Sequence, residues 1–205
     1  GFDVVTVLSP GPDRAHYMPT SQVVMLKLVV DKTSRRLLGV QAVGPGDGAK
    51  RVDVAVAAIT AGMTVDQIAK LDLCYAPPFA PAMDNLITAA DVARNKLDGL
   101  MRGITPMEVR ERQQRGDAFT FLDVRGPAEW EEVRLPDSIN MPLGALRSRL
   151  GELDKQTPIV AFCKVSLRGY EAARILTAAG FSNVSVMDGG VAMWPYEKVA
   201  GPSRS

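Results

Sequence analysis

One short segment of the chain combines a cysteine and an arginine at a spacing that suits anion chemistry. It begins at Cys163 and ends at Arg168, and the residues between them are Lys164, Val165, Ser166 and Leu167. The apolar residues 158–162 before it predict a strand, and residues 168–179 after it predict a helix. Backbone N–H groups in a loop between a strand and a helix turn inward and form a cradle for an anion. We therefore expect this segment to bind an anion at the start of the helix.

The cysteine of this segment has the surroundings of a nucleophile. The inward N–H groups and the helix dipole both stabilise a thiolate at Cys163. A thiolate attacks a sulfane sulfur and keeps it as a covalent persulfide, while Arg168 offers an anionic donor a permanent charge and a fork of donors. The alternative is a buried structural cysteine, which is a common environment for a free thiol. The sequence around the segment favours the reactive interpretation.

Four further blocks of sequence resemble the rhodanese family in content and order. The resemblance spans residues 104–198 and implies a sulfurtransferase in which Cys163 and Arg168 are catalytic and residues 164–167 bind the substrate. The blocks are residues 122–125 (LDVR), Glu129 with Trp130, residues 135–142 (LPDSINMP), and residues 188–190 (DGG) with Trp194.

The length of the cysteine loop distinguishes two chemistries. The related dual-specificity phosphatases place five residues between the cysteine and the arginine, which leaves room for a phosphate group. Four residues separate Cys163 from Arg168 in this chain. The smaller cradle therefore resembles the sulfurtransferase form.

Other residues of these blocks are expected to be structural. Asp123 and Arg125 are predicted to form a buried pair near the loop, and Trp194 is predicted to lie in the core. The chain departs from the family at Val133-Arg134, where Gly-His is common, so any role of that histidine is absent. It also carries Ser166 where family members more often have glycine, which affects the shape of the loop.

Hydrophobic patterns divide the chain into two units with different element order. The first unit has predicted strands at residues 4–8, 22–30 and 37–43, followed by predicted helices at 50–61, 64–71 and 80–96. The second unit alternates predicted helices at 105–115, 143–150 and 168–179 with predicted strands at 119–124, 158–162 and 184–187. The last two strands of the first unit are expected to pair antiparallel. The alternation in the second predicts a parallel sheet flanked by helices, so the overall class is α/β.

A glycine-rich stretch in the first unit imitates a nucleotide-binding motif. Residues 44–49 (GPGDGA) satisfy the spacing G-x-G-x-x-G/A. The required context is missing, because the preceding strands are predicted to be antiparallel and the following helix leads to another helix. We therefore expect no nucleotide at this loop.

The first unit resembles the dimerisation domain of flavin-dependent pyridine-nucleotide disulfide oxidoreductases. The closest resemblance is to the coenzyme A-disulfide reductases that carry a fused rhodanese domain. The blocks that carry it are residues 14–19 (RAHYMP), 38–44 (LGVQAVG) and 71–79 (LDLCYAPPF).

This second resemblance implies an organisation and a set of partners. It divides the chain into an α+β dimerisation domain at residues 1–96, a linker at 97–104 and a rhodanese-like domain at 105–200. Tyr17 and Tyr75 would supply hydroxyl groups to the active site of a partner subunit in a homodimer, although Tyr75 could instead be a core residue at a strand end. FAD, NAD(P)H and coenzyme A are implied for a full-length parent, and no cofactor is expected in this chain.

Composition limits the remaining classes of function. The 205 residues include 24 basic and 23 acidic side chains, so no nucleic-acid partner is indicated, and no apolar stretch is long enough to span a membrane. Two isolated cysteines favour a reducing cytoplasm, with Cys74 expected to be a packed thiol. The single histidine, His16, is expected on the surface, and no metal site is predicted. The first residue is not methionine, which suggests a piece of a longer protein or a processed product.

Together these patterns predict the sulfur-transfer part of a coenzyme A-disulfide or polysulfide reductase. Cys163 would take sulfane sulfur from thiosulfate, polysulfide or a coenzyme A persulfide and pass it to a thiol such as coenzyme A. The alternative is a non-catalytic rhodanese-fold module that serves interaction or regulation beside a dimerisation domain. The presence of both Cys163 and Arg168 favours the enzyme.

Overall fold

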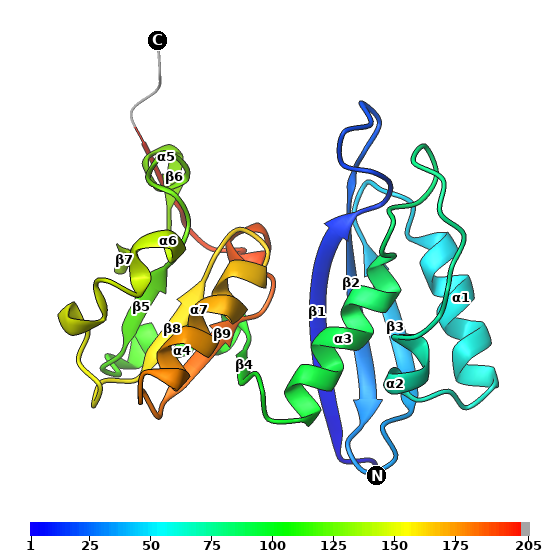
Figure 1. Cartoon of the computed structure of the whole chain (residues 1–205), viewed down its shortest axis with the longest axis horizontal. Helices are drawn as coiled ribbons and strands as arrows, with labels where there is room; N and C mark the ends of the chain where they lie inside the picture. The colour runs from blue at the N-terminus through cyan, green and yellow to red at the C-terminus, as the bar shows by residue number, and fades with distance from the viewer. Residues whose placement is uncertain (202–205) are drawn as a thin grey trace. The chain divides into compact units, whose positions relative to one another are not determined.

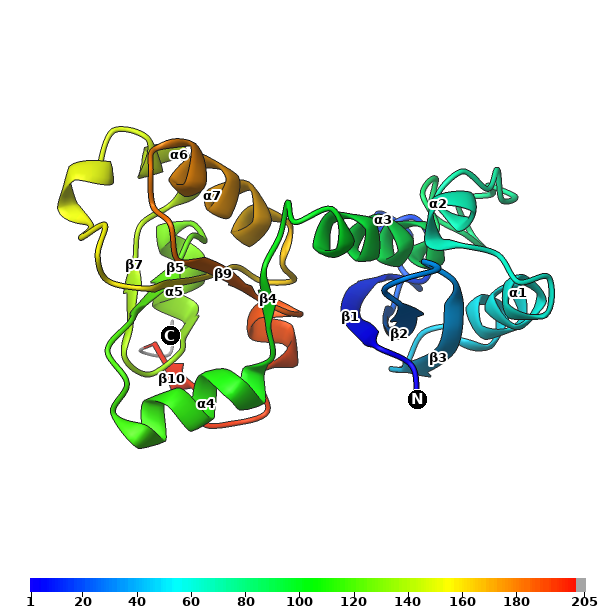
Figure 2. The same cartoon turned by 90° about the horizontal axis from the view of Figure 1, so that it is seen from below.

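A computed structural model describes residues 1–201, and the chain consists of two compact units that divide between Leu100 and Met101 (Figure 1). The N-terminal unit is built on a three-stranded antiparallel sheet in the order β1-β2-β3. Helix α3 packs on β1 and β2, and α1 packs on β3 (Figure 2). These elements are β1 (Val4–Pro12), β2 (Val23–Asp31), β3 (Leu37–Val43), α1 (Ala49–Thr60), α2 (Val65–Ile68) and α3 (Asn85–Leu97).

The core of this unit lies between the sheet and its helices. Alternate side chains of a strand point to the same face, and β2 buries Val24, Leu26, Leu28 and Val30 completely in this way. The helices meet this face with small residues, which allow the backbones to approach closely. These residues are Ala55 and Ala58 of α1 and Ala89, Ala90 and Ala93 of α3.

A buried arginine joins three segments of the N-terminal unit. Arg51 of α1 is 1% exposed, and its Nε lies 3.1 Å from a carboxylate oxygen of Asp84. Its other nitrogens donate to the carbonyl groups of Asp13 and Asp47, at 2.5 and 2.9 Å. Asp84 also caps α3 by accepting from the N–H of Leu86 at 3.0 Å. The guanidinium therefore fixes the loop after β1 to the starts of α1 and α3.

The predicted antiparallel pair is confirmed as β2 and β3, but several predicted bounds were wrong. The helix predicted from residue 80 begins at Asn85, because Asp84 adopts an extended conformation and caps it. The helix predicted over residues 64–71 is the single turn Val65–Ile68, which Thr64 caps. Strand β1 continues past Pro10 to Pro12, since an edge strand tolerates proline.

The environment predicted for Cys74 was also wrong. The thiol lies in the loop between α2 and α3, which has no regular secondary structure, and it is exposed rather than packed. Its neighbour Leu73 is half-buried instead. A loop residue has no periodic pattern from which its direction could be predicted.

The C-terminal unit contains a five-stranded parallel sheet in the order β4-β9-β8-β5-β7, as predicted. Helices α6 and α7 cover one face of this sheet and α4 covers the other (Figure 2). The strands are β4 (Gly103–Ile104), β5 (Thr120–Asp123), β7 (Ser138–Asn140), β8 (Ile159–Phe162) and β9 (Val184–Met187). The helices are α4 (Pro106–Arg115), α5 (Pro127–Glu132), α6 (Leu143–Leu146) and α7 (Leu167–Ala178), with 3₁₀ turns η1 (Leu150–Glu152) and η2 (Gly190–Met193). A short antiparallel ribbon pairs β6 (Val133–Arg134) with β10 (Val199–Ala200).

Aromatic rings fill the core on the α4 side of this sheet. Phe121 of β5 lies 4.3 Å from Phe162 of β8 and 5.9 Å from Trp194, measured between ring centroids. Trp194 is 2% exposed, which confirms its predicted place in the core. The helix predicted over residues 143–150 is interrupted, because the Ser148 hydroxyl donates to the carbonyl of Ala145 and competes with helical hydrogen bonding.

None of the helices in the described part of the chain combines the length and the apolar character that crossing a bilayer would require.

Replacing Arg51 with methionine should destabilise the N-terminal unit by about 3 kcal/mol, since it leaves the Asp84 carboxylate buried without its partner. Urea unfolding followed by circular dichroism would measure the loss. Arg94→Met is the matched control, because Arg94 pairs with Asp66 and Asp91 at the surface and such pairs contribute at most about 1 kcal/mol. Equal losses in the two variants would show that the buried arginine has no special structural role.

Candidate active site

Cys163 lies where the sheet brings several strand ends together. Because the strands are parallel, their carboxyl ends meet at one edge, where binding sites of such sheets are found. Cys163 directly follows Phe162 at the end of β8, and α7 begins four residues later at Leu167. The residue is 1% exposed. The strand–loop–helix arrangement around this thiol is therefore the one that the sequence predicted.

The loop aims a backbone donor at the sulfur. The N–H of Ser166 lies 3.3 Å from Cys163 Sγ. The N–H groups in the first turn of a helix have no acceptor within the helix, so those of α7 are available to a group bound at its start. The side chains of Lys164 and Leu167 are exposed, and that of Val165 is half-buried. Near the sulfur the loop therefore presents backbone N–H groups more than side chains.

Arg168 faces the sulfur and is held by a carboxylate. Its two terminal nitrogens donate to the two oxygens of Glu129, at 2.6 and 2.8 Å. The Glu129 hydrogen bond raises the pKa of Arg168, and the charge and hydrogen bond of Cys163 contribute in the same direction. The same ion pair lowers the pKa of Glu129 to about 2, helped by the N–H of Gly126. Glu129 belonged to a motif of the sequence, but its pairing with Arg168 was not predicted.

Asp123 and Arg125 form the predicted buried pair beside the loop. The Arg125 guanidinium donates to both Asp123 oxygens at 2.6 to 3.0 Å and to the carbonyl of Val133 at 2.7 Å. The Asn140 side chain donates to the carbonyls of Asp123 and Arg125, each at 3.0 Å. This network joins the ends of β5, β6 and β7. In the sheet, Asp123 of β5 pairs with Phe162 of β8, which directly precedes Cys163.

The turn after β9 packs closely against the cysteine loop and forms hydrogen bonds with it. The N–H groups of Val191 and Ala192 donate to the carbonyls of Cys163 and Lys164, at 2.9 and 3.0 Å. Gly190 has φ +56°, and a Cβ atom built there would lie 2.2 Å from the Cys163 carbonyl oxygen. Only glycine fits this contact. The sequence contained the DGG motif, but a motif alone does not show that it packs against the thiol loop.

Tyr17 and Tyr75 are brought together in the N-terminal unit. The two hydroxyls are hydrogen-bonded to each other, which raises the pKa of Tyr17. The side chains are 62% and 52% exposed, and the N–H of Ala15 donates to the carbonyl of Pro77, joining the two loops at 3.1 Å. The alternative of a core tyrosine at position 75 is therefore wrong. Phe79, 70% exposed, lies in the loop that follows Tyr75.

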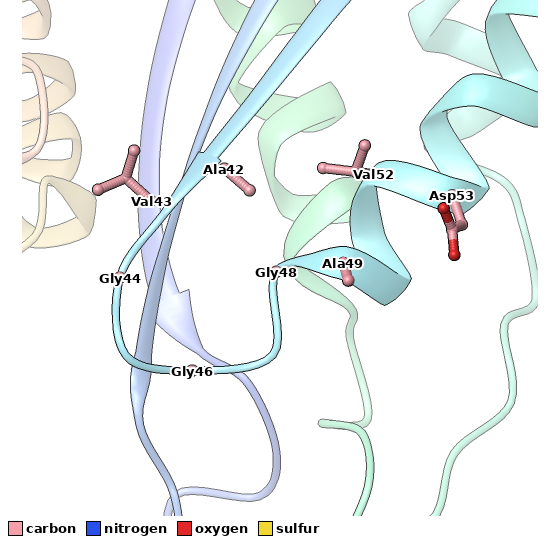
Figure 3. Close-up of a pocket in the computed structure, with 8 residues that line it drawn as sticks. All are labelled: Ala42, Val43, Gly44, Gly46, Gly48, Ala49, Val52 and Asp53. Carbon is pink, nitrogen blue, oxygen red and sulfur yellow. The ribbon is translucent and has the colours of Figure 1, made fainter.

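The glycine-rich loop 44–49 borders a surface pocket of about 320 Å³ between β3 and α1 (Figure 3). Gly44 has φ +140°, and a Cβ there would lie 2.4 Å from the Val23 carbonyl oxygen. A Cβ at Gly48 would lie 2.9 Å from that of Ala42. These glycines serve close packing. Asp53 is the one charged side chain among the residues that line this pocket, and its carboxylate would repel a phosphate group.

Metal-binding residues were not predicted from the sequence, and residues 1–201 contain no group of three or more His, Cys, Asp or Glu side chains that could hold a metal ion. His16 is exposed, as expected, and its ring contacts that of Tyr17 at 5.6 Å between centroids.

Comparison with known families covers both units. Residues 105–196 match the family described as Rhodanese-like domain, and residues 1–87 match Pyridine nucleotide-disulphide oxidoreductase, dimerisation domain. The thiosulfate sulfurtransferase GlpE of Pseudomonas syringae is 30% identical over 102 residues, which cover 48% of this chain and 94% of GlpE.

Two larger proteins are similar as well. The NAD(P)H sulfur oxidoreductase (CoA-dependent) of Pyrococcus furiosus is 47% identical over 94 residues, which cover 46% of this chain and 21% of that protein. A solved NAD-dependent persulfide reductase from A. fulgidus is 47% identical with a TM-score of 0.85 over 95% of this chain and 34% of that one. The chain thus spans about a fifth to a third of these larger relatives. Both resemblances inferred from the sequence are confirmed: the chain belongs to the rhodanese-like family through residues 105–196 and carries the dimerisation domain of the pyridine nucleotide-disulphide oxidoreductases at residues 1–87.

Proposed function

We propose that this chain is the sulfur-transfer part of a coenzyme A-dependent persulfide or polysulfide reductase, with Cys163 as the sulfur carrier. The observation that carries the proposal is the position of Cys163 Sγ, 3.3 Å from the N–H of Ser166 and beside the Arg168 guanidinium. These groups stabilise a sulfur anion at the start of α7. They also support catalysis over the alternative of a non-catalytic rhodanese-fold module.

The proposed cycle consists of two displacements at sulfur. In the first, the Cys163 thiolate attacks the outer sulfur of a persulfide or thiosulfate donor. The new S–S bond forms at Cys163 as the donor's own bond to that sulfur breaks, and its electron pair leaves with the donor as a thiolate or sulfite. In the second, an acceptor thiolate attacks the outer sulfur of the Cys163 persulfide and regenerates the thiolate. Neither displacement needs an oxidant or a reductant.

The loop and its arginine have separate parts in this cycle. The backbone N–H groups of residues 164–168 hold the sulfur anion, which is Cys163 Sγ in the thiolate and the outer sulfur in the persulfide. Arg168 binds the charged end of the donor, and Glu129 keeps its guanidinium oriented through a bidentate pair. The four residues between Cys163 and Arg168 form a smaller cradle than the five of the phosphatases, which supports sulfur transfer over phosphatase chemistry.

The remaining predictions concern the larger protein. We propose that FAD and NAD(P)H act in flavin and nicotinamide domains outside this chain, which itself carries no cofactor, and that coenzyme A is the thiol acceptor. The exposed Tyr17–Tyr75 pair would complete the active site of the other subunit in a homodimer. Domain bounds at 1–96 and 105–200 with a linker between them, and a cytoplasmic location, belong to the same proposal.

Replacing Cys163 with serine should abolish sulfur transfer by at least about a thousandfold, because the hydroxyl is a much weaker nucleophile. Intact mass after incubation with thiosulfate or polysulfide would show the gain of sulfur in the wild type and its loss in the variant. Cys74→Ser, which changes the exposed cysteine, should keep full activity. Continued turnover by the Cys163 variant would exclude the assigned nucleophile.

Replacing Arg168 with alanine should raise the KM for thiosulfate by about 10- to 100-fold, the value of a charge-assisted hydrogen bond. Steady-state kinetics with thiosulfate and with a phosphate ester would measure it, and the ester should not be hydrolysed. Arg174→Ala, which removes an exposed arginine from the same helix, should leave the KM unchanged. An unaltered KM in the Arg168 variant, or ester hydrolysis that depends on Cys163, would contradict the assignment.

The Arg168–Glu129 pair should give a defined pH dependence of stability. The pKa of Glu129 falls from 4.5 to about 2 on folding, so the pair stabilises fully above pH 4.5 and is lost as the pH falls to about 2. At pH 7 the free energy of unfolding of the wild type should exceed that of Glu129→Gln by about 1 kcal/mol, which is typical of a partly exposed ion pair. Urea unfolding at pH 7 and near pH 2 would test this; a difference that persists near pH 2 would mean that another interaction is responsible.

A further inference from the structure

Ser166 occupies a backbone conformation that favours glycine. Its φ of +118° and ψ of −32° lie in the region where a Cβ atom crowds the neighbouring peptide groups. Two other non-glycine residues among 1–201, Arg35 and Asp137, have positive φ, each near +60°. Some interaction must therefore hold Ser166 in this conformation.

The hydroxyl of Ser166 provides that interaction. It accepts from the N–H of Gly189 at 2.8 Å, and it donates to the carbonyl of Met187 at 3.5 Å. Both partners are backbone groups at the end of β9 and in the turn after it. The hydroxyl is therefore engaged away from the cradle, and the part of Ser166 that is available to a bound sulfur is its N–H.

The conformation of Ser166 sets the geometry on both sides of the loop. Its N–H lies 3.3 Å from Cys163 Sγ, and its carbonyl accepts the first helical hydrogen bond of α7, from Tyr170 at 2.8 Å. Because β8 and α7 hold the two ends of the loop, a change in φ at Ser166 that relieved the strain must be compensated by the torsions of the residues before it, which would turn the peptide that carries this N–H away from the sulfur. The Gly189 contact opposes that rotation.

We propose that the Ser166 hydroxyl is a positioning group, which ties the cysteine loop to Gly189 and keeps the Ser166 N–H on the reacting sulfur. The inference rests on the proposed sulfur-transfer function and names a residue that controls its rate. The N–H favours the reactive thiolate of Cys163 over the neutral thiol, and it does not contact the charged end of the donor. Loss of the tether should therefore slow the attack by Cys163 and leave the binding of the donor unchanged.

Two variants of the whole chain separate the tether from the backbone conformation. Ser166→Gly adopts a positive φ without strain but has no hydroxyl, and Ser166→Ala lacks the hydroxyl and keeps the strained Cβ. We expect kcat for sulfur transfer to fall about tenfold in both variants, which is the effect of losing one hydrogen bond. The KM for the donor should stay unchanged. Ser148→Ala, which removes a hydroxyl bonded to the Ala145 carbonyl on α6, should keep the wild-type kcat.

The turnover of Ser166→Gly decides whether the Ser166 hydroxyl has a positioning role or is merely tolerated at this position. If Ser166→Gly turns over as fast as the wild type, or faster, the hydroxyl has no positioning role and the inference is overturned. Thermal melts measure any loss of stability. We expect the melting temperature to fall less in Ser166→Gly than in Ser166→Ala, because glycine relieves the strain.

Hydrogen exchange separates failure of this inference from failure of the proposed function. If the wild type moves no sulfur, the proposed function is wrong, and the tether is then judged by exchange of the Gly189 amide. We expect this amide to exchange about tenfold faster in Ser166→Gly. The Val191 and Ala192 amides, which donate to other acceptors in the same loop, should be unchanged. An unaltered Gly189 rate would overturn the inference whatever the activity.

Discussion

The contact between Gly190 and the carbonyl of Cys163 is the constraint on which the site depends. A Cβ atom at Gly190 would come within 2.2 Å of that oxygen, so the turn after β9 can touch the cysteine loop only as glycine. This closeness allows the N–H of Val191 to reach the Cys163 carbonyl and the N–H of Gly189 to reach Ser166. The loop has no regular secondary structure of its own. It therefore takes its shape from β9 and the turn that follows it, which are distant in sequence but adjacent in the sheet.

In the N-terminal unit, irregular loops are held in place by a buried charge and not by a glycine contact. The loops that carry Tyr17 and Tyr75 leave both tyrosines largely exposed. The segments beside them are anchored to the buried guanidinium of Arg51, through the carbonyl of Asp13 and the carboxylate of Asp84. A buried arginine needs partners for its charge and its donors. The ion pair with Asp84 and the hydrogen bonds to the carbonyls of Asp13 and Asp47 fix three irregular segments at once, which a single apolar side chain could not do.

Sequence patterns predicted the sheets and the thiol loop, but not the interactions that shape them. The parallel sheet and the position of Cys163 followed from periodicity, because strand and helix periods are local properties. The Glu129–Arg168 pair joins residues 39 apart and depends on where α5 lies relative to the start of α7, which no local pattern records. Cys74 was placed wrongly for a related reason, since it lies in a loop without periodicity. The start of α3 was predicted wrongly because its cap, Asp84, is held in place by an ion pair with the buried Arg51.

The charges of the candidate site explain how it can work without a histidine. The chain's one histidine, His16, belongs to the N-terminal unit, and Val133-Arg134 stands where a Gly-His pair is common among rhodaneses. In the proposed cycle each displacement exchanges one sulfur anion for another, so the residue at position 163 carries the same charge as thiolate and as persulfide, although in the persulfide the charge lies on the outer sulfur. Arg168 is paired with Glu129, and we propose that the backbone N–H groups of the loop bind the anion together with that guanidinium. Because no proton must move while the charge at Cys163 is constant, the site needs fixed donors rather than a general base.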